Sequence, residues 1–88
     1  MNDHPRRVLV VLMGSLGDVV RGLYIIDALK EADAATHISW LVEPACAGIV
    51  RLHPRVDRVI VFDRSRGMRG VLDLRRELAR HTFDITLD

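Results

Sequence analysis

The chain has a single cysteine, Cys46, a single lysine, Lys30, and no long apolar run. One cysteine excludes a disulfide within the chain, and its presence as a lone thiol is typical of proteins in reducing compartments. The apolar run nearest the N-terminus, residues 8–13, is six residues long. Such a run is too short for the core of a signal peptide or for a transmembrane helix. We therefore expect a soluble, cytoplasmic protein.

Metal-binding patterns are also missing. The histidines are scattered along the chain, at His4, His37, His53 and His81, and they show no metal-ligand spacing. We therefore expect neither a metal site nor a bound cofactor, and nucleic acid is not among the expected partners.

The composition is otherwise that of a globular protein. Of the 88 residues, 49% are apolar and 28% are charged, and the net charge is +1. Nine of the twelve arginines lie within residues 51–80, interleaved with several acidic residues. The plain interpretation is a solvated surface of mixed charge. Arginine also suits two-point contacts with carboxylate or phosphate groups, so a binding role stays open.

Apolar periodicity predicts alternating strands and helices. Strands are expected at residues 8–13, 37–42, 56–62 and 83–87, with Trp40 in the core. Helices are expected from Asp18 to about residues 32–35, over 45–52 and over 71–79, and a loop over 63–70. The order βαβαβαβ predicts an α/β fold, a Rossmann-like parallel sheet. Tyr24 is expected to pack the first helix against this sheet, and the alternative is that it lines the ligand cleft.

The chain stops just after the fourth predicted strand, without a closing helix. One face of the sheet would then be poorly covered. We therefore expect residues 1–88 to be a single partial domain of a larger protein. The alternative is a complete small protein that covers this surface by self-association.

The turn Gly14-Ser15-Leu16-Gly17-Asp18 lies between the first strand and the first helix. In an open α/β sheet this edge binds ligands. Glycines permit a close approach of the backbone, and free N–H groups at the helix start can hold an anion or a sugar hydroxyl. Asp18 has two interpretations at this stage. It is a general base, or Ser15 or Asp18 is a helix cap.

Two standard phosphate-binding motifs are excluded for this turn. The Walker loop requires a lysine, and none follows Gly17. The dinucleotide fingerprint requires Gly-x-Gly-x-x-Gly, and the spacing of Gly14, Gly17 and Gly22 does not match it. Glu43, however, ends the second strand, where ribose-binding acids often sit. A nucleotide-binding or regulatory α/β module therefore remains an alternative.

Four segments, in order, resemble bacterial lipopolysaccharide heptosyltransferases of glycosyltransferase family 9. They are VLVVLMGSLGDVV (8–20), SWLVEP (39–44), HPRVDRVI (53–60) and FDITLD (83–88). The resemblance implies a two-domain GT-B enzyme that inverts the anomeric centre. The chain would be part of the N-terminal, acceptor-binding domain. The C-terminal domain, which binds the nucleotide sugar, typically ADP-heptose, would be absent, and the fragment alone would be inactive.

The resemblance also assigns roles to residues. Asp18 becomes the expected general base for the acceptor hydroxyl. The residues expected to bind the acceptor are Gly14, Ser15, Gly17, Glu43, Arg64, Arg66 and Arg69. The arginines follow the third strand on the ligand-binding edge, where guanidinium groups suit an anionic acceptor.

The implied partners are a lipopolysaccharide core acceptor and a nucleotide-sugar donor. A peripheral contact with the inner membrane and self-association stay open, as does a non-catalytic remnant. Leu12, Gly22 and Tyr24 depart from the family's pattern, so the acceptor is left unspecified.

Overall fold

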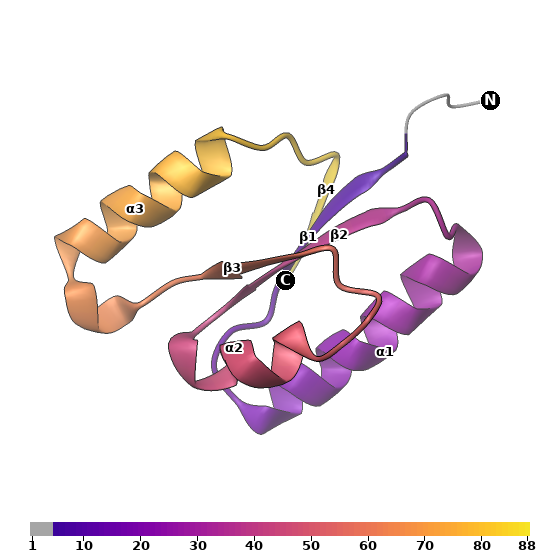
Figure 1. Cartoon of the computed structure of the whole chain (residues 1–88), viewed down its shortest axis with the longest axis horizontal. Coiled ribbons are helices and arrows are strands. Elements are labelled where there is room, and N and C mark those ends of the chain that lie inside the picture. The colour runs from indigo at the N-terminus through magenta and orange to yellow at the C-terminus, as the bar shows by residue number, and fades with distance from the viewer. Residues whose placement is uncertain (1–4) are drawn as a thin grey trace.

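The computed structural model describes residues 5–88, so His4 lies outside it. The elements follow one another as β1 (Arg7–Val11), α1 (Leu16–Ala32), β2 (His37–Val42), α2 (Pro44–Arg51), β3 (Arg58–Val61), the 3₁₀ turn η1 (Arg64–Arg66), α3 (Met68–Ala79) and β4 (Ile85–Leu87). The strands form one parallel sheet in the order β3-β2-β1-β4 (Figure 1). The predicted α/β class is confirmed.

Strand β1 lies inside the sheet, between β2 and β4. Val8 pairs with Ile38 on one side and with Ile85 on the other. After β1, strands β2 and β3 follow on one side of β1, and β4 then pairs with the other side of β1. The strand order therefore reverses between β1 and β4. Such a switch point is where open α/β sheets bind ligands, at the carboxyl ends of the strands.

Helices cover both faces of the sheet. Helices α1 and α2 lie on one face and α3 on the other (Figure 1). The larger apolar cluster, on the α1 side, includes the fully buried Trp40, Ile26 and Val10. The α3 side holds a smaller cluster of Leu9, Leu41 and Ile60, against which side chains of α3 pack.

The structure differs from the sequence prediction mainly at the ends of elements. Helix α1 begins at Leu16, before Asp18, because Ser15 caps it. The predicted loop 63–70 contains η1 and the first residues of α3. Asp63 accepts hydrogen bonds from the Ser65 backbone N–H at 3.0 Å and from its hydroxyl at 2.6 Å, which stabilises this turn. Gly67, with φ of 58°, then adopts a backbone conformation that favours glycine.

Two further differences concern exposure and pairing. Tyr24 is 75% exposed, so the expectation that it packs α1 against the sheet is wrong. Strands β3 and β4 are shorter than predicted. Both are edge strands, each with one hydrogen-bonded neighbour.

Candidate functional site

A pocket of about 470 Å³ opens at the carboxyl ends of β1 and β4. It is lined by Val11, Leu12, Met13, Gly14, Ser15, Asp18, Arg21, Arg64 and Asp88. These residues come from the end of β1, the start of α1, the η1 turn and the residue after β4. The pocket therefore lies at the switch point of the sheet and contains most of the turn that the sequence singled out.

Ser15 is the N-cap of α1. Its backbone is extended, with φ of −124° and ψ of 158°, and its hydroxyl accepts a hydrogen bond from the Asp18 N–H at 3.1 Å. This arrangement satisfies one of the free N–H groups at the helix start. Of the two residues considered as the cap, Ser15 fills that position, and the Asp18 carboxylate is available for other contacts.

The Asp18 carboxylate lies one helical turn before Arg21. Arg21 Nη2 donates to Asp18 Oδ1 at 2.7 Å. This hydrogen bond is the main cause that holds the pKa of Asp18 below its ordinary value, and the Gly14 N–H acts in the same direction while burial opposes it. The positive end of the α1 dipole also favours the charged form. Asp18 is therefore an ionised carboxylate at neutral pH, able to accept a proton.

Glu43 lies beside the same turn, at the end of β2. Its backbone N–H donates to the Met13 carbonyl at 3.1 Å, but its side chain does not cap α2. Instead, a methyl group at Gly14 would come within 3.2 Å of Glu43 Oε2. Alanine at position 14 would therefore require this carboxylate to move by a few tenths of an ångström. The other carboxylate oxygen of Glu43, Oε1, pairs with Arg64, whose Nε lies 2.8 Å away.

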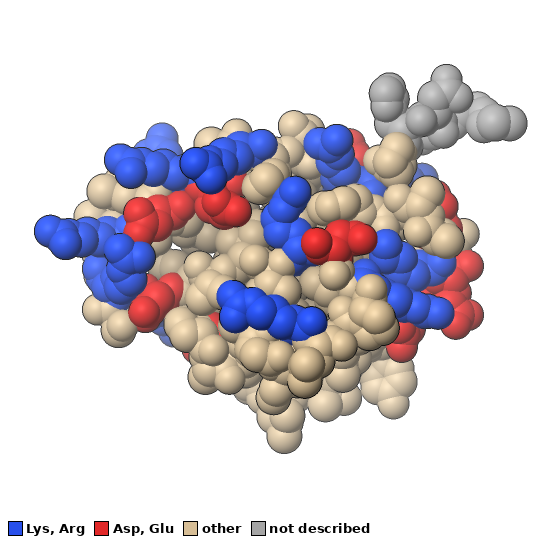
Figure 2. Space-filling view, in the orientation of Figure 1, with Lys and Arg blue, Asp and Glu red and all other residues tan. Residues whose placement is uncertain are grey.

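The other two arginines of the predicted set do not line the pocket. Arg66 is paired with Asp73 of α3, with Nη1 and Oδ2 2.7 Å apart, and Arg69 is exposed on the first turn of α3. Gly17, which is exposed in the first turn of α1, is also outside the lining, as is Glu43, which reaches the pocket only through its pairing with Arg64. Figure 2 shows basic and acidic side chains interleaved on the face it draws, as the plain interpretation of the charge pattern expected.

Sequence reasoning missed Arg21 and Asp88. Arg21 counted only as part of the polar face of the first helix. Its position three residues after Asp18 was the available signal, since side chains at this spacing meet on a helix surface. Asp88 follows β4, and its place beside the turn depends on β4 pairing with β1 rather than with β3.

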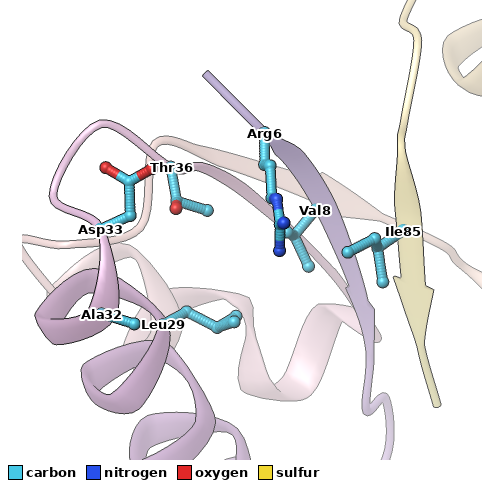
Figure 3. A pocket seen from close by; sticks show the side chains of 7 residues that line it. All are labelled: Arg6, Val8, Leu29, Ala32, Asp33, Thr36 and Ile85. Atoms are coloured by element: carbon cyan, nitrogen blue, oxygen red, sulfur yellow. The ribbon is translucent and has the colours of Figure 1, made fainter. Parts of the chain in front are cut away.

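A second hollow, of about 400 Å³, lies between the end of α1 and strand β4 (Figure 3). Figure 3 shows Leu29 and Ala32 of α1 on one side and Ile85 of β4 on the other. None of the residues predicted to be functional lines this hollow. Within residues 5–88, no group of His, Cys, Asp and Glu side chains could hold a metal ion. The same part of the chain has no helix long and apolar enough to cross a membrane.

Comparison with known proteins identifies two relatives, although no model of a protein family matches the chain. The lipopolysaccharide core heptosyltransferase OpsX of Haemophilus influenzae is 26% identical over 86 residues, which are 98% of this chain and 24% of that protein. The crystal structure of a glycosyltransferase of family 9 from Veillonella parvula matches with a TM-score of 0.80 and 24% identity. That match covers 98% of this chain and 26% of the other.

The chain thus spans about a quarter of the length of both relatives. Its parallel sheet and helices have the fold of the matching part of a family 9 structure. The resemblance to glycosyltransferase family 9 that the sequence motifs indicated is therefore confirmed, over nearly the whole of this chain.

Proposed function

We propose that this chain is the acceptor-binding part of an inverting glycosyltransferase. The enzyme would transfer heptose, or a related sugar, from a nucleotide sugar to a lipopolysaccharide core acceptor. The observation that carries the proposal is the position of Asp18, an ionised carboxylate in the pocket at the switch point of the sheet. The similarity to a heptosyltransferase supports the choice of sugar and acceptor.

In the proposed reaction, Asp18 accepts the proton of the acceptor hydroxyl. The hydroxyl oxygen then bonds to the anomeric carbon of the donor as the bond to the nucleoside diphosphate breaks, so the configuration inverts in one step. A carboxylate has about four lone-pair sites, so Arg21 on Oδ1 leaves others for the hydroxyl. Arg21 fixes the direction of the carboxylate, which is what a general base needs before the substrate arrives.

Arg64 and Glu43 are the proposed contacts of the acceptor's polar groups. They pair with each other at 2.8 Å beside Gly14, and the Arg64 side chain is 67% exposed. An anionic group of the acceptor would compete with Glu43 for this guanidinium. Gly14, Ser15 and Gly17 present backbone at the start of α1. Arg66 and Arg69 lie outside the pocket, so we assign them to acceptor atoms beyond it.

The donor would bind elsewhere in a longer protein. Because the relatives are about four times as long as this chain, we propose that their remaining sequence includes the donor-binding domain of a GT-B fold. Transfer would then occur in the cytoplasm, with or without a peripheral contact at the inner membrane. The 88-residue chain alone would not transfer sugar, and measurable transfer by it would contradict this part of the proposal.

The test uses the full-length protein that contains this chain, with ADP-heptose and a lipopolysaccharide core acceptor. Asp18→Asn is expected to lower kcat by about 100-fold or more, the usual effect of losing a general base, with little change in KM. Glu31→Gln, at an exposed acid near the end of α1, is the control and should keep wild-type kcat. Activity of Asp18→Asn within a few-fold of wild type would reject Asp18 as the base.

The nucleotide-binding alternative requires a separate measurement. Calorimetry of the 88-residue chain with ADP should detect no binding if this part of the protein serves the acceptor. Saturable ADP binding that Glu43→Gln abolishes would instead favour a nucleotide-binding module, because Glu43 is the acid expected to contact a ribose.

A further inference from the structure

A small pocket lies at the opposite edge of the sheet, where the strands begin. Its volume is about 120 Å³, and its lining residues are Arg7, His37, Arg58, His81, Thr82 and Phe83. Four of these six side chains are arginine or histidine, and none is acidic. The pocket is therefore unlike the one beside Gly14, where each of two arginines already faces a carboxylate.

The sheet register explains why these arginine and histidine side chains meet. Arg7 is the Cα partner of His37, and Arg58 is the partner of Ser39, two residues further along β2. Side chains alternate between the faces of a sheet, so these residues share the face on which Leu9 and Ile60 pack beneath α3. His81 reaches the same edge from the turn after α3.

One lining residue already has an acidic partner, because Glu77 Oε1 lies 3.5 Å from His81 Nε2. The other neighbouring carboxylates, Asp57 and Asp84, are engaged by groups outside the lining or by the backbone. Asp57 accepts hydrogen bonds from the Ile38 N–H at 2.7 Å and from Lys30 Nζ at 2.9 Å. Asp84 accepts from the backbone N–H of Arg7 at 2.8 Å. Within residues 5–88, the guanidinium groups of Arg7 and Arg58 form no ion pair. Both remain available to an anion.

The hydroxyl of Ser39 is a further polar group near these strands that lacks a hydrogen-bond partner. Its side chain is fully buried, and its hydroxyl has no hydrogen-bond partner among the described residues. Leaving a buried hydroxyl unpaired is unfavourable. Ser39 follows His37 on the same face of β2 and pairs with Arg58, but it does not line the pocket, so we count it as a neighbour of the site and not as one of its ligands.

We infer that this pocket binds a small tetrahedral oxyanion, a phosphate group held by Arg7, Arg58, His37 and His81. Its volume equals that of about four liquid water molecules, which fits a phosphate but is too small for a whole nucleotide. Guanidinium groups bind phosphate oxygens through strong, charge-assisted hydrogen bonds. The inference concerns the edge remote from Asp18 and does not depend on sugar transfer.

The protonation of His37 provides a direct readout. Burial lowers the pKa of His37, Arg58, Arg7 and Lys30 lower it further, and Asp57 opposes them. A phosphate beside the imidazole would offset the cationic neighbours and raise this pKa. The competing interpretation is that the cations only complement the negative end of the α3 dipole, in which case no anion is required.

The experiment is a titration of the isotope-labelled 88-residue chain with inorganic phosphate, followed through the histidine ring resonances. Sodium chloride at equal ionic strength is the reference, and His53, which lies outside the pocket, is the internal control. We expect saturable shifts of the His37 and His81 resonances with phosphate alone. Shifts no larger than those with chloride, or equal shifts at His53, would overturn the inference.

Variants locate the binding site. Arg58→Gln should weaken phosphate binding about tenfold, as expected for the loss of a charge-assisted hydrogen bond, and Arg75→Gln on α3 should leave it unchanged. Unchanged affinity in Arg58→Gln would count against the site. If that variant fails to fold, Arg7→Gln gives the same comparison at the other arginine. Glycerol phosphate, titrated in parallel, distinguishes a phosphomonoester ligand, which binds in both forms, from a site that accepts only the free ion.

Discussion

The indole ring of Trp40 lies so close to Gly22 that a methyl group at position 22 would come within 2.3 Å of Trp40 Cζ2. Trp40 is fully buried, and its Nε1–H donates to the Leu12 carbonyl at 2.9 Å. One side chain of β2 therefore fixes the distance of α1 from the sheet and holds the end of β1, from which the Gly14 turn leaves. Leu12 and Gly22 thus both contact this ring.

Gly22→Ala is expected to destabilise the chain. Alanine favours a helix over glycine by about 1 kcal/mol, but the clash with a fully buried ring forces repacking that costs about 1–3 kcal/mol. Because the contact is far inside van der Waals distance, we expect the upper part of this range and a net loss of about 1–2 kcal/mol. Chemical denaturation measures the free energy of unfolding. Gly48→Ala is the matched control, because nothing lies within 4 Å of the added methyl group in α2. Equal or greater stability of Gly22→Ala than of Gly48→Ala would contradict the packing described.

Ser15→Ala should lower the free energy of unfolding by about 1 kcal/mol, because the Asp18 N–H loses its capping oxygen. Ser15→Thr keeps a capping hydroxyl and should restore most of the loss. Thermal unfolding followed by circular dichroism compares the two. A Thr variant as unstable as the Ala variant would mean that the hydroxyl does not act as a cap.

Arg21→Gln is expected to raise the pKa of Asp18, since the hydrogen bond from Arg21 is the main cause of its lowered value. Carbon-13 NMR of the Asp18 carboxyl group measures this pKa directly. In the full-length enzyme, the acidic limb of the pH–rate profile should move to higher pH in the same direction, because the base would be protonated earlier as pH falls. Arg51→Gln, at the end of α2, serves as the control, and an unmoved Asp18 pKa in Arg21→Gln would rule out this role.

Asp57 links stability to pH. Burial raises its pKa, but hydrogen bonds from the Ile38 N–H and from Lys30 outweigh burial and hold the pKa below its ordinary value of 3.8. A carboxylate with a lowered pKa in the folded state contributes stability above pH 3.8, and this contribution is lost as pH falls through the folded-state pKa.

Asp57→Ala should therefore be less stable at pH 7 by about 1–2 kcal/mol, a range that allows for the partial exposure of the pair. The difference in free energy of unfolding between Asp57→Ala and wild type should shrink as pH falls below 3.8. Urea denaturation across this pH range gives the measurement. A difference that is constant with pH would show that the carboxylate charge is not its source.

The sequence predicted the interior of the sheet better than its margins. The second strand is observed at the predicted residues, His37–Val42, because continuous apolar side chains mark a strand that is covered on both faces. The start of α3 was not predicted, since it depends on how Asp63 and Gly67 shape the preceding turn. Such a local arrangement of hydrogen bonds leaves no periodic signal in the sequence.

The same contrast holds for the site. Parallel strands end at one edge, so the sequence could place Gly14, Glu43 and the arginine loop together before any geometry was known. It could not tell which arginine faces the pocket, because this depends on competing acidic partners. Arg66 pairs with Asp73, whereas Arg64 pairs with Glu43 and lines the pocket.

Because Arg64 lines the pocket whereas Arg66 does not, Arg64 is the arginine whose loss should affect acceptor binding. Arg64→Ala should change the free energy of unfolding by less than about 1 kcal/mol, because its ion pair with Glu43 is largely exposed. In the full-length enzyme the same variant should raise the acceptor KM about tenfold, the effect of one lost charge-assisted contact, with a smaller change in kcat. Arg75→Ala, on the exposed part of α3, should alter neither quantity. Steady-state kinetics with the acceptor varied at saturating donor separates these outcomes. An acceptor KM unchanged in Arg64→Ala would mean that this arginine only holds Glu43 in place and does not itself contact the acceptor.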